Sequence, residues 1–97
     1  MAKRLPPLNS LRAFESAARN LSFTKAADEL YVTQAAVSHQ IKTLESYLSI
    51  KLFHRKNRSL LLTEEGQSYF HDLRDIFINI QEATQRLVNV GAKGTIS

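Results

Sequence analysis

The chain has 97 residues, of which 43% are hydrophobic; this suits one small domain with an appended helix and excludes two independent cores. It has no cysteine, and its three histidines lack any short ligand spacing, so we expect no disulfide, no metal and no cofactor. The net charge of +4 is concentrated in residues 51–60, which hold four basic residues and no acidic one, and this favours a polyanionic partner. No apolar run approaches the length of a membrane span, and the first residues lack a signal-peptide pattern, so we expect a cytoplasmic protein with no membrane partner.

Two short helices are expected first. Pro6 and Pro7 favour an extended entry, and Asn9 is the predicted N-cap of a helix over residues 10–19. Ser22 can cap a second helix over residues 23–30, in which a pair of alanines indicates close approach to another helix.

A third helix is expected over residues 33–48, with Thr33 as its N-cap. Its apolar stripe is formed by Val37, Ile41, Leu44 and Leu48. A second face is small, polar and basic, with no acidic residue, and consists of Gln34, Ala35, Ser38, His39 and Lys42. Only Tyr31 and Val32 separate this helix from the second, which is helix-turn-helix spacing without the usual glycine; an ordinary helical hairpin is the alternative.

Residues 52–62 are predicted to form a β-hairpin, which we call the wing, because two apolar runs flank the polar segment HRKNRS. A solvated charge run is the alternative interpretation.

Thr63 then caps a long helix with two glutamates in its first turn. Along that helix apolar positions recur in steps of three and four, which predicts a dimerisation seam with a second copy, formed by Phe70, Leu73, Phe77, Ile80, Thr84 and Leu87. The alternative is that the helix folds back on its own headpiece.

The segments SFTKAADELYVTQAAVSHQIKTLE and LFHRKNRSLLLTEEG resemble the N-terminal DNA-binding domain of the LysR-type transcriptional regulators, and the resemblance extends from Leu8 to about Val90. It implies a mainly α winged helix-turn-helix domain, three helices plus the hairpin, over residues 1–62. A linker helix for dimerisation would cover residues 63–90, and residues 91–97 would be a hinge toward a C-terminal effector domain that is absent here. Within the family, the first 45 residues are similar to a subgroup that regulates genes of glycine and amino-acid metabolism.

The resemblance also implies which residues meet DNA. Base readout is expected from Gln34, Ala35, Ser38 and His39. Ala35 stands where the family more usually has proline and His39 where arginine is commonest, so the preferred half-site should differ while the docking mode stays. Contacts to the DNA backbone are expected from Lys3, Arg4, Thr24, Lys25, Thr33, Lys42, Arg55, Lys56 and Arg58.

The function implied is that of a sequence-specific, double-stranded-DNA-binding domain of a bacterial transcription regulator, which binds an interrupted palindromic operator as a homodimer. RNA polymerase is a candidate partner, and higher oligomers are expected only for a full-length protein. An enzyme is not expected, because the sequence has no phosphate-binding glycine loop, metal cluster or catalytic triad. A helix-mediated interaction adaptor remains an alternative, as does an RNA-binding module, although the phenylalanines lie in apolar stripes and not on a binding face.

Overall fold

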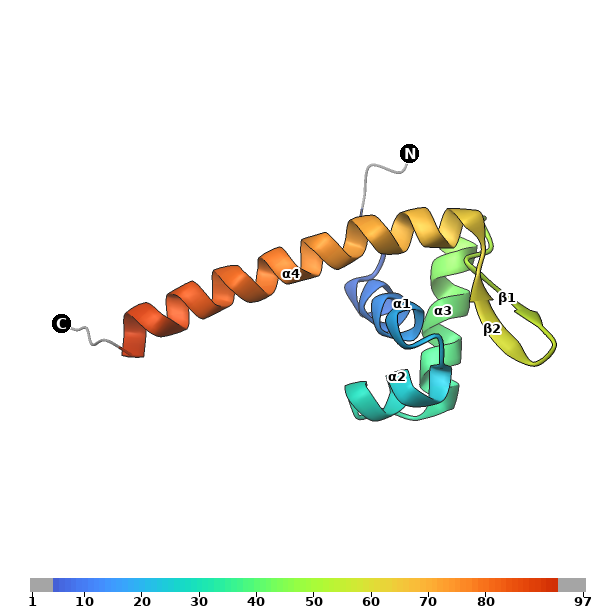
Figure 1. The fold of residues 1–97 in the computed structure, drawn as a ribbon, viewed down its shortest axis with the longest axis horizontal. Helices are drawn as coiled ribbons and strands as arrows, with labels where there is room; N and C mark the ends of the chain where they lie inside the picture. The colour runs from blue at the N-terminus through green and yellow to red at the C-terminus, as the bar shows by residue number, and fades with distance from the viewer. Residues whose placement is uncertain (1–4, 93–97) are drawn as a thin grey trace.

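The computed structural model describes residues 5–92 and is mostly helical (Figure 1). The elements in chain order are α1 (Leu8–Asn20), α2 (Phe23–Leu30), α3 (Gln34–Leu48), β1 (Phe53–Lys56), β2 (Ser59–Leu62) and α4 (Glu64–Ala92). The first three helices and the wing form a headpiece, residues 5–62. Figure 1 shows α4 crossing the headpiece and then extending beyond it as a single rod. The fold is therefore a winged helix-turn-helix followed by a long helix, as predicted.

The three short helices start and stop through local backbone chemistry. Ser22 and Thr33 are the N-caps of α2 and α3, as predicted, and their hydroxyls accept hydrogen bonds from backbone amides three residues later, at 3.0 Å each. The prediction that Asn9 caps α1 is wrong. The N-cap is Pro7, with no side-chain cap bond, because its carbonyl accepts from the amides of Ser10 and Leu11 at 3.0 and 3.1 Å. Asn9 already lies inside the helix.

The helix-turn-helix turn does without a glycine. Tyr31 ends α2 in the left-handed conformation with a φ of 59°, and its amide hydrogen-bonds back to the carbonyls of the last turn. A non-glycine residue in this conformation carries a steric cost. The turn nevertheless brings α3 directly after α2, and both helices pack on α1. The ordinary helical hairpin is therefore excluded.

The core lies between the three helices and the wing. Phe14 is fully buried, and its ring meets that of Phe53 in the wing edge-on, with centroids 5.5 Å apart, and that of Tyr69 in α4 at 5.6 Å. Ala17 and Ala26 are also fully buried, which allows α1 and α2 to approach closely. One buried phenylalanine thus joins the helical part of the headpiece to both the wing and the long helix.

The start of α4 is attached to the wing. The Thr63 hydroxyl accepts from the Gly66 amide at 3.0 Å, confirming the predicted cap, and also donates to the Lys51 carbonyl at 2.7 Å. Gly66 is required by space, because a Cβ there would stand 2.2 Å from the Leu52 carbonyl oxygen. The backbone of α4 therefore begins in direct contact with the segment immediately before β1.

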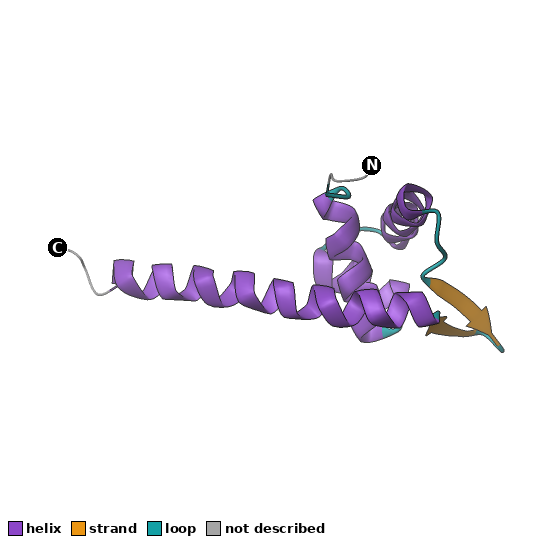
Figure 2. Ribbon diagram, turned by 90° about the horizontal axis from the view of Figure 1, so that it is seen from above, coloured by secondary structure: helices purple, strands orange, loops and turns teal. Residues whose placement is uncertain are grey.

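The predicted dimerisation seam is divided between two environments. Leu73 is only 6% exposed and belongs to the core of the headpiece, and Phe70 and Phe77 are partly buried against the same core. Leu73 is thus covered by its own chain, so its assignment to a subunit seam is corrected. Figure 2 shows that α4 extends beyond the headpiece. Phe77 still packs against the core, whereas Ile80 and Leu87 are 54% and 74% exposed. The helix folds back on its headpiece over its first turns only.

No helix within residues 5–92 combines the length and the apolarity needed to cross a membrane. Helix α4 continues through Gly91 to Ala92, slightly further than expected. The remaining predicted hinge residues, 93–97, lie outside the described residues, as do Lys3 and Arg4, two of the expected backbone contacts.

Candidate nucleic-acid interface

Helix α3 presents two different faces, as predicted. Val37, Ile41 and Leu44 are buried in the core. On the other side the chain exposes Gln34, Ala35, His39 and Lys42, with Ser38 half-buried beside them. We call this set the outer face of α3; it contains no acidic side chain. Because the core holds the inner face rigidly, the outer face is a fixed, weakly polar and basic surface at the exposed N-terminal end of the helix.

Two of the predicted contact residues touch one another. The Thr24 hydroxyl, in the first turn of α2, donates to Oε1 of Gln34, the first residue of α3, at 3.2 Å. From the family resemblance, Thr24 is expected to meet the DNA backbone, and this contact with Gln34 is not predicted by the sequence. Lys25 and Thr33 are exposed nearby, and the Thr33 hydroxyl is already used as the N-cap.

The wing is an antiparallel hairpin with a two-residue turn. Phe53 pairs with Leu62 and Lys56 with Ser59, and between them Asn57 and Arg58 both have positive φ, 52° and 69°. Positive φ at both positions is the geometry of a type I′ turn, which matches the twist of the strands. Phe53 and Leu60 point into the core, while the polar side chains of the wing are exposed: His54, Arg55, Lys56 and Arg58. The basic residues are therefore displayed on a defined hairpin.

A groove of about 340 Å³ separates α3 from the wing. It is lined by Gln34, Ser38 and Lys42 on one side and by His54 and Arg55 on the other, among others. Arg55 also lies over the ring of Phe23, with its guanidinium carbon 5.8 Å from the ring centroid. The groove thus brings together part of the predicted set, namely Gln34, Ser38 and Lys42 of α3 and Arg55 of the wing. The remaining predicted contacts of these elements do not line it: Ala35, His39, Lys56 and Arg58.

Sequence reasoning missed the residue that joins the wing to α3. Glu45 Oε2 accepts from the backbone amides of Leu52 at 2.8 Å and Phe53 at 3.3 Å, while its Oε1 lies 3.7 Å from Lys51 Nζ. Its carboxylate therefore faces the base of the wing, and its charge is offset by the amides and the lysine. The only signal in the sequence was an acidic residue at the edge of the apolar stripe of α3.

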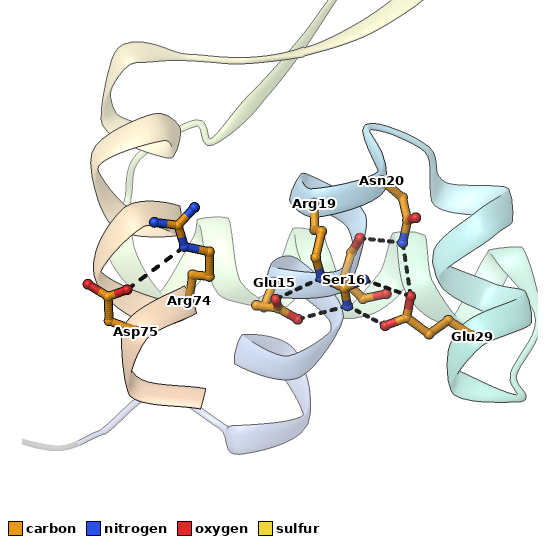
Figure 3. A network of polar contacts seen from close by, with 7 residues as sticks. All are labelled: Glu15, Ser16, Arg19, Asn20, Glu29, Arg74 and Asp75. Carbon is orange, nitrogen blue, oxygen red and sulfur yellow. Dashed lines mark hydrogen bonds and ion pairs between the residues drawn. The ribbon is translucent and has the colours of Figure 1, made fainter. Parts of the chain in front are cut away.

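A polar network fixes α2 against α1 (Figure 3). Arg19 bonds to Glu15, with Nε and Oε2 3.0 Å apart, and to Glu29, with Nη1 and Oε1 3.0 Å apart. Asn20 joins the same carboxylate at 3.2 Å. The hydrogen bonds from Arg19 lower the pKa of Glu29 from 4.5 to about 2. This network holds the helix that carries Thr24 in a set orientation relative to the rest of the headpiece.

Among residues 5–92 no cluster of three or more His, Asp or Glu side chains is placed to hold a metal ion. What the surface offers instead is hydrogen-bonding groups at a helix N-terminus next to a basic hairpin. These features define the class of winged helix-turn-helix proteins.

The family of bacterial regulatory helix-turn-helix proteins described as the lysR family matches residues 8–67, and the chain belongs to it. The glycine cleavage system transcriptional activator of Escherichia coli strain K12 is 66% identical over all 97 residues, which cover 32% of that protein. Its homolog in Haemophilus influenzae is 69% identical over 90 residues, covering 93% of this chain and 30% of the relative. These relatives are transcriptional regulators and not enzymes, and the chain spans about a third of their length.

Solved structures give the same fold. A crystal structure of the BenM DBD in complex with catB site 1 DNA superposes with a TM-score of 0.80 at 32% identity, covering 93% of this chain and 99% of that one. The match includes both the headpiece and much of α4, because it covers nearly the whole chain.

Proposed function

We propose that this chain is the sequence-specific, double-stranded-DNA-binding part of a bacterial LysR-family transcription regulator. The observation that carries the proposal is the outer face of α3, free of acidic side chains and set beside the exposed basic wing. An α-helix fits the major groove, where the residues at its N-terminal end meet base edges. The wing then lies along the sugar-phosphate backbone, where Arg55, Lys56 and Arg58 neutralise phosphates.

The chain acts as a homodimer on an interrupted palindrome, with the part of α4 beyond Phe77 as the contact between subunits. The exposed apolar residues of that part support this assignment, since contact with a second copy would remove their apolar surface from water. A regulator of this kind works in the cytoplasm, where RNA polymerase is a candidate partner. The similarity to activators of the glycine cleavage system supports genes of glycine metabolism as its targets. Residues 91–97 would lead into an effector-binding domain.

The test starts with selection of bound duplexes from a random library, followed by titration of the selected operator, random duplex and single-stranded RNA. We expect Gln34→Ala to cost about 1–3 kcal/mol on the operator and almost nothing on random duplex, because a glutamine carboxamide reads adenine bidentately. Ser38→Ala should weaken binding with less change in preference. Equal loss on operator and random duplex would mean that Gln34 does not read the sequence. Preference for RNA, or no nucleic-acid binding by the folded chain, would overturn the proposal.

The sequence-independent part of DNA binding can be recognised by the dependence of the affinity on salt concentration. Eight phosphate contacts per dimer give a plot of log affinity against log salt with a slope of about −7, and Arg58→Ala should flatten it by about one per subunit. Arg12→Ala removes the same charge from an exposed position of α1, outside both the expected DNA contacts and the dimerisation seam, and serves as the control. A slope that responds equally to both variants would remove Arg58 from the contact set.

A further inference from the structure

We propose that Thr24 determines base specificity without reading a base itself, by positioning the carboxamide of Gln34. The inference rests on the proposed function and deepens it. Its basis is the hydrogen bond of 3.2 Å from the Thr24 hydroxyl to Gln34 Oε1, which joins the first turns of α2 and α3 across the helix-turn-helix. Thr24 is thus a positioning residue for the base-reading glutamine, in place of the phosphate contact expected from sequence.

The backbone is held in place at both residues of this hydrogen bond. On the side of α2, the Ser22 hydroxyl caps the helix, and the Phe23 ring packs edge-on against Phe53, with centroids 5.4 Å apart and planes at 88°. On the side of α3, the Thr33 hydroxyl caps the helix immediately before Gln34. The threonine side chain is short and β-branched, so in a helix its hydroxyl has two favoured positions, far fewer than the carboxamide of the longer glutamine. The bond therefore restrains the long glutamine and not the reverse.

The restraint matters because a carboxamide has two unlike ends. In the observed arrangement Oε1 accepts from Thr24 and keeps a second lone pair, while Nε2 keeps both of its hydrogens. Adenine offers an N6 donor and an N7 acceptor in the major groove, which matches that pair of groups. A carboxamide without the restraint can turn its other end to the groove and accept other base edges. Loss of Thr24 should therefore reduce discrimination as well as affinity.

Thr24→Val and Thr24→Ser form the matched pair for the test, because valine keeps the shape without the hydroxyl and serine keeps the hydroxyl. We expect Thr24→Val to weaken operator binding by about 3- to 10-fold, the range for losing the pre-ordering of one long side chain. Discrimination should fall by a similar factor at the base pair that depends on Gln34, while random-duplex affinity and the salt slope stay unchanged. Thr24→Ser should retain operator affinity and preference. Unchanged melting temperatures would establish that both variants keep the fold.

A double-mutant cycle separates action through Gln34 from direct contact. In the Gln34→Ala background, Thr24→Val should have no further effect on the operator. An equal, additive loss on operator and random duplex, with a shallower salt slope, would make Thr24 a phosphate contact and overturn the proposal. The proposal would also be overturned if Thr24→Val kept the full operator affinity and base preference. If the unsubstituted chain shows no preferred duplex, it is the proposed function that fails, and the cycle distinguishes that outcome from failure of the positioning role alone.

Discussion

Gly66 has no room for a side chain. A Cβ at this position would lie 2.2 Å from the Leu52 carbonyl oxygen, and backbone cannot move aside as a flexible side chain can. We expect Gly66→Ala to lower the free energy of unfolding by about 1–3 kcal/mol, the usual cost of overpacking, and to separate α4 from the wing.

Gly91→Ala is the matched control for Gly66→Ala, because a Cβ at Gly91 meets nothing within 4 Å. Alanine there should be neutral or stabilising by up to about 1 kcal/mol, since glycine is a poor helix former. Urea denaturation of both variants checks the pair. Equal stability of the two variants would show that the space around Gly66 relaxes easily.

The carboxylate of Glu29 makes part of the stability depend on pH. Its pKa in the folded chain is about 2, below the ordinary 4.5, so the charged form is favoured by folding. This contribution is complete above pH 4.5 and is lost as pH falls toward 2. We expect Glu29→Gln to destabilise the chain at pH 7 by about 1 kcal/mol or less, because the side chain is 37% exposed and solvent screens the pair.

The difference in unfolding free energy between the unsubstituted chain and Glu29→Gln should therefore close between pH 4.5 and pH 2. Chemical denaturation at several pH values measures it. Glu82→Gln, which removes the same charge from an exposed position of α4, should show no such closing. A difference that persists unchanged at pH 2 would mean that the Arg19 network does not carry the effect.

For single helices and strands, the sequence predicted the features that depend on residues close together in the chain. The caps by Ser22, Thr33 and Thr63 are confirmed because each is a contact within three residues. The wing is confirmed because the two apolar runs that flank the segment HRKNRS pair as β1 and β2, with Asn57 and Arg58 at positive φ in the turn. The predicted cap at Asn9 is wrong for another local reason. Pro7, whose ring fixes its φ, supplies the first carbonyl that accepts hydrogen bonds in α1.

Contacts between different helices and strands could not be predicted from the sequence pattern. Periodicity indicates that a face of α4 is apolar but not what covers it, so Leu73 and Leu87 look alike in the sequence and differ in the structure. In the same way, nothing local joins Thr24 to Gln34 or Glu45 to the wing. The sequence predicted which side chains are exposed on the outer face of α3 and on the wing, whereas it did not predict the bonds that orient them.

Glu45 joins α3 to the start of the wing through two amide bonds, and their contribution can be tested. Glu45→Gln keeps the size but loses the charge that strengthens both amide bonds and the pairing with Lys51. We expect a loss of about 1.5–3 kcal/mol in unfolding free energy and faster hydrogen exchange at the Leu52 and Phe53 amides. Exchange measured by NMR, with Asp72→Asn on α4 as control, checks it. Unaltered protection of the two amides would show that the core alone holds the wing.

At the scale of the whole molecule, the described residues extend 56 × 33 × 20 Å, because α4 continues past the headpiece. Beyond Phe77 its exposed apolar side chains include Ile80, Leu87, Val88 and Val90. A helix extending into water without partners is marginally stable, and such a stripe is a surface for another helix. A second copy would place two headpieces at a fixed separation, which is what a palindromic operator requires.

Ile80→Asp tests this assembly, because Ile80 is the residue of the predicted seam nearest the headpiece that is not packed against it. A charge in the seam should separate the dimer, since an unpaired buried carboxylate is costly. The two half-sites would then be bound independently, and operator affinity should fall by a factor of about 10² or more. Asn89→Asp adds the same charge on the opposite side of the helix, nine residues or about 180° away, and should leave the dimer intact. Sedimentation and operator titration measure both variants, and an unsubstituted chain that is monomeric at high micromolar concentration would exclude α4 as the dimer contact.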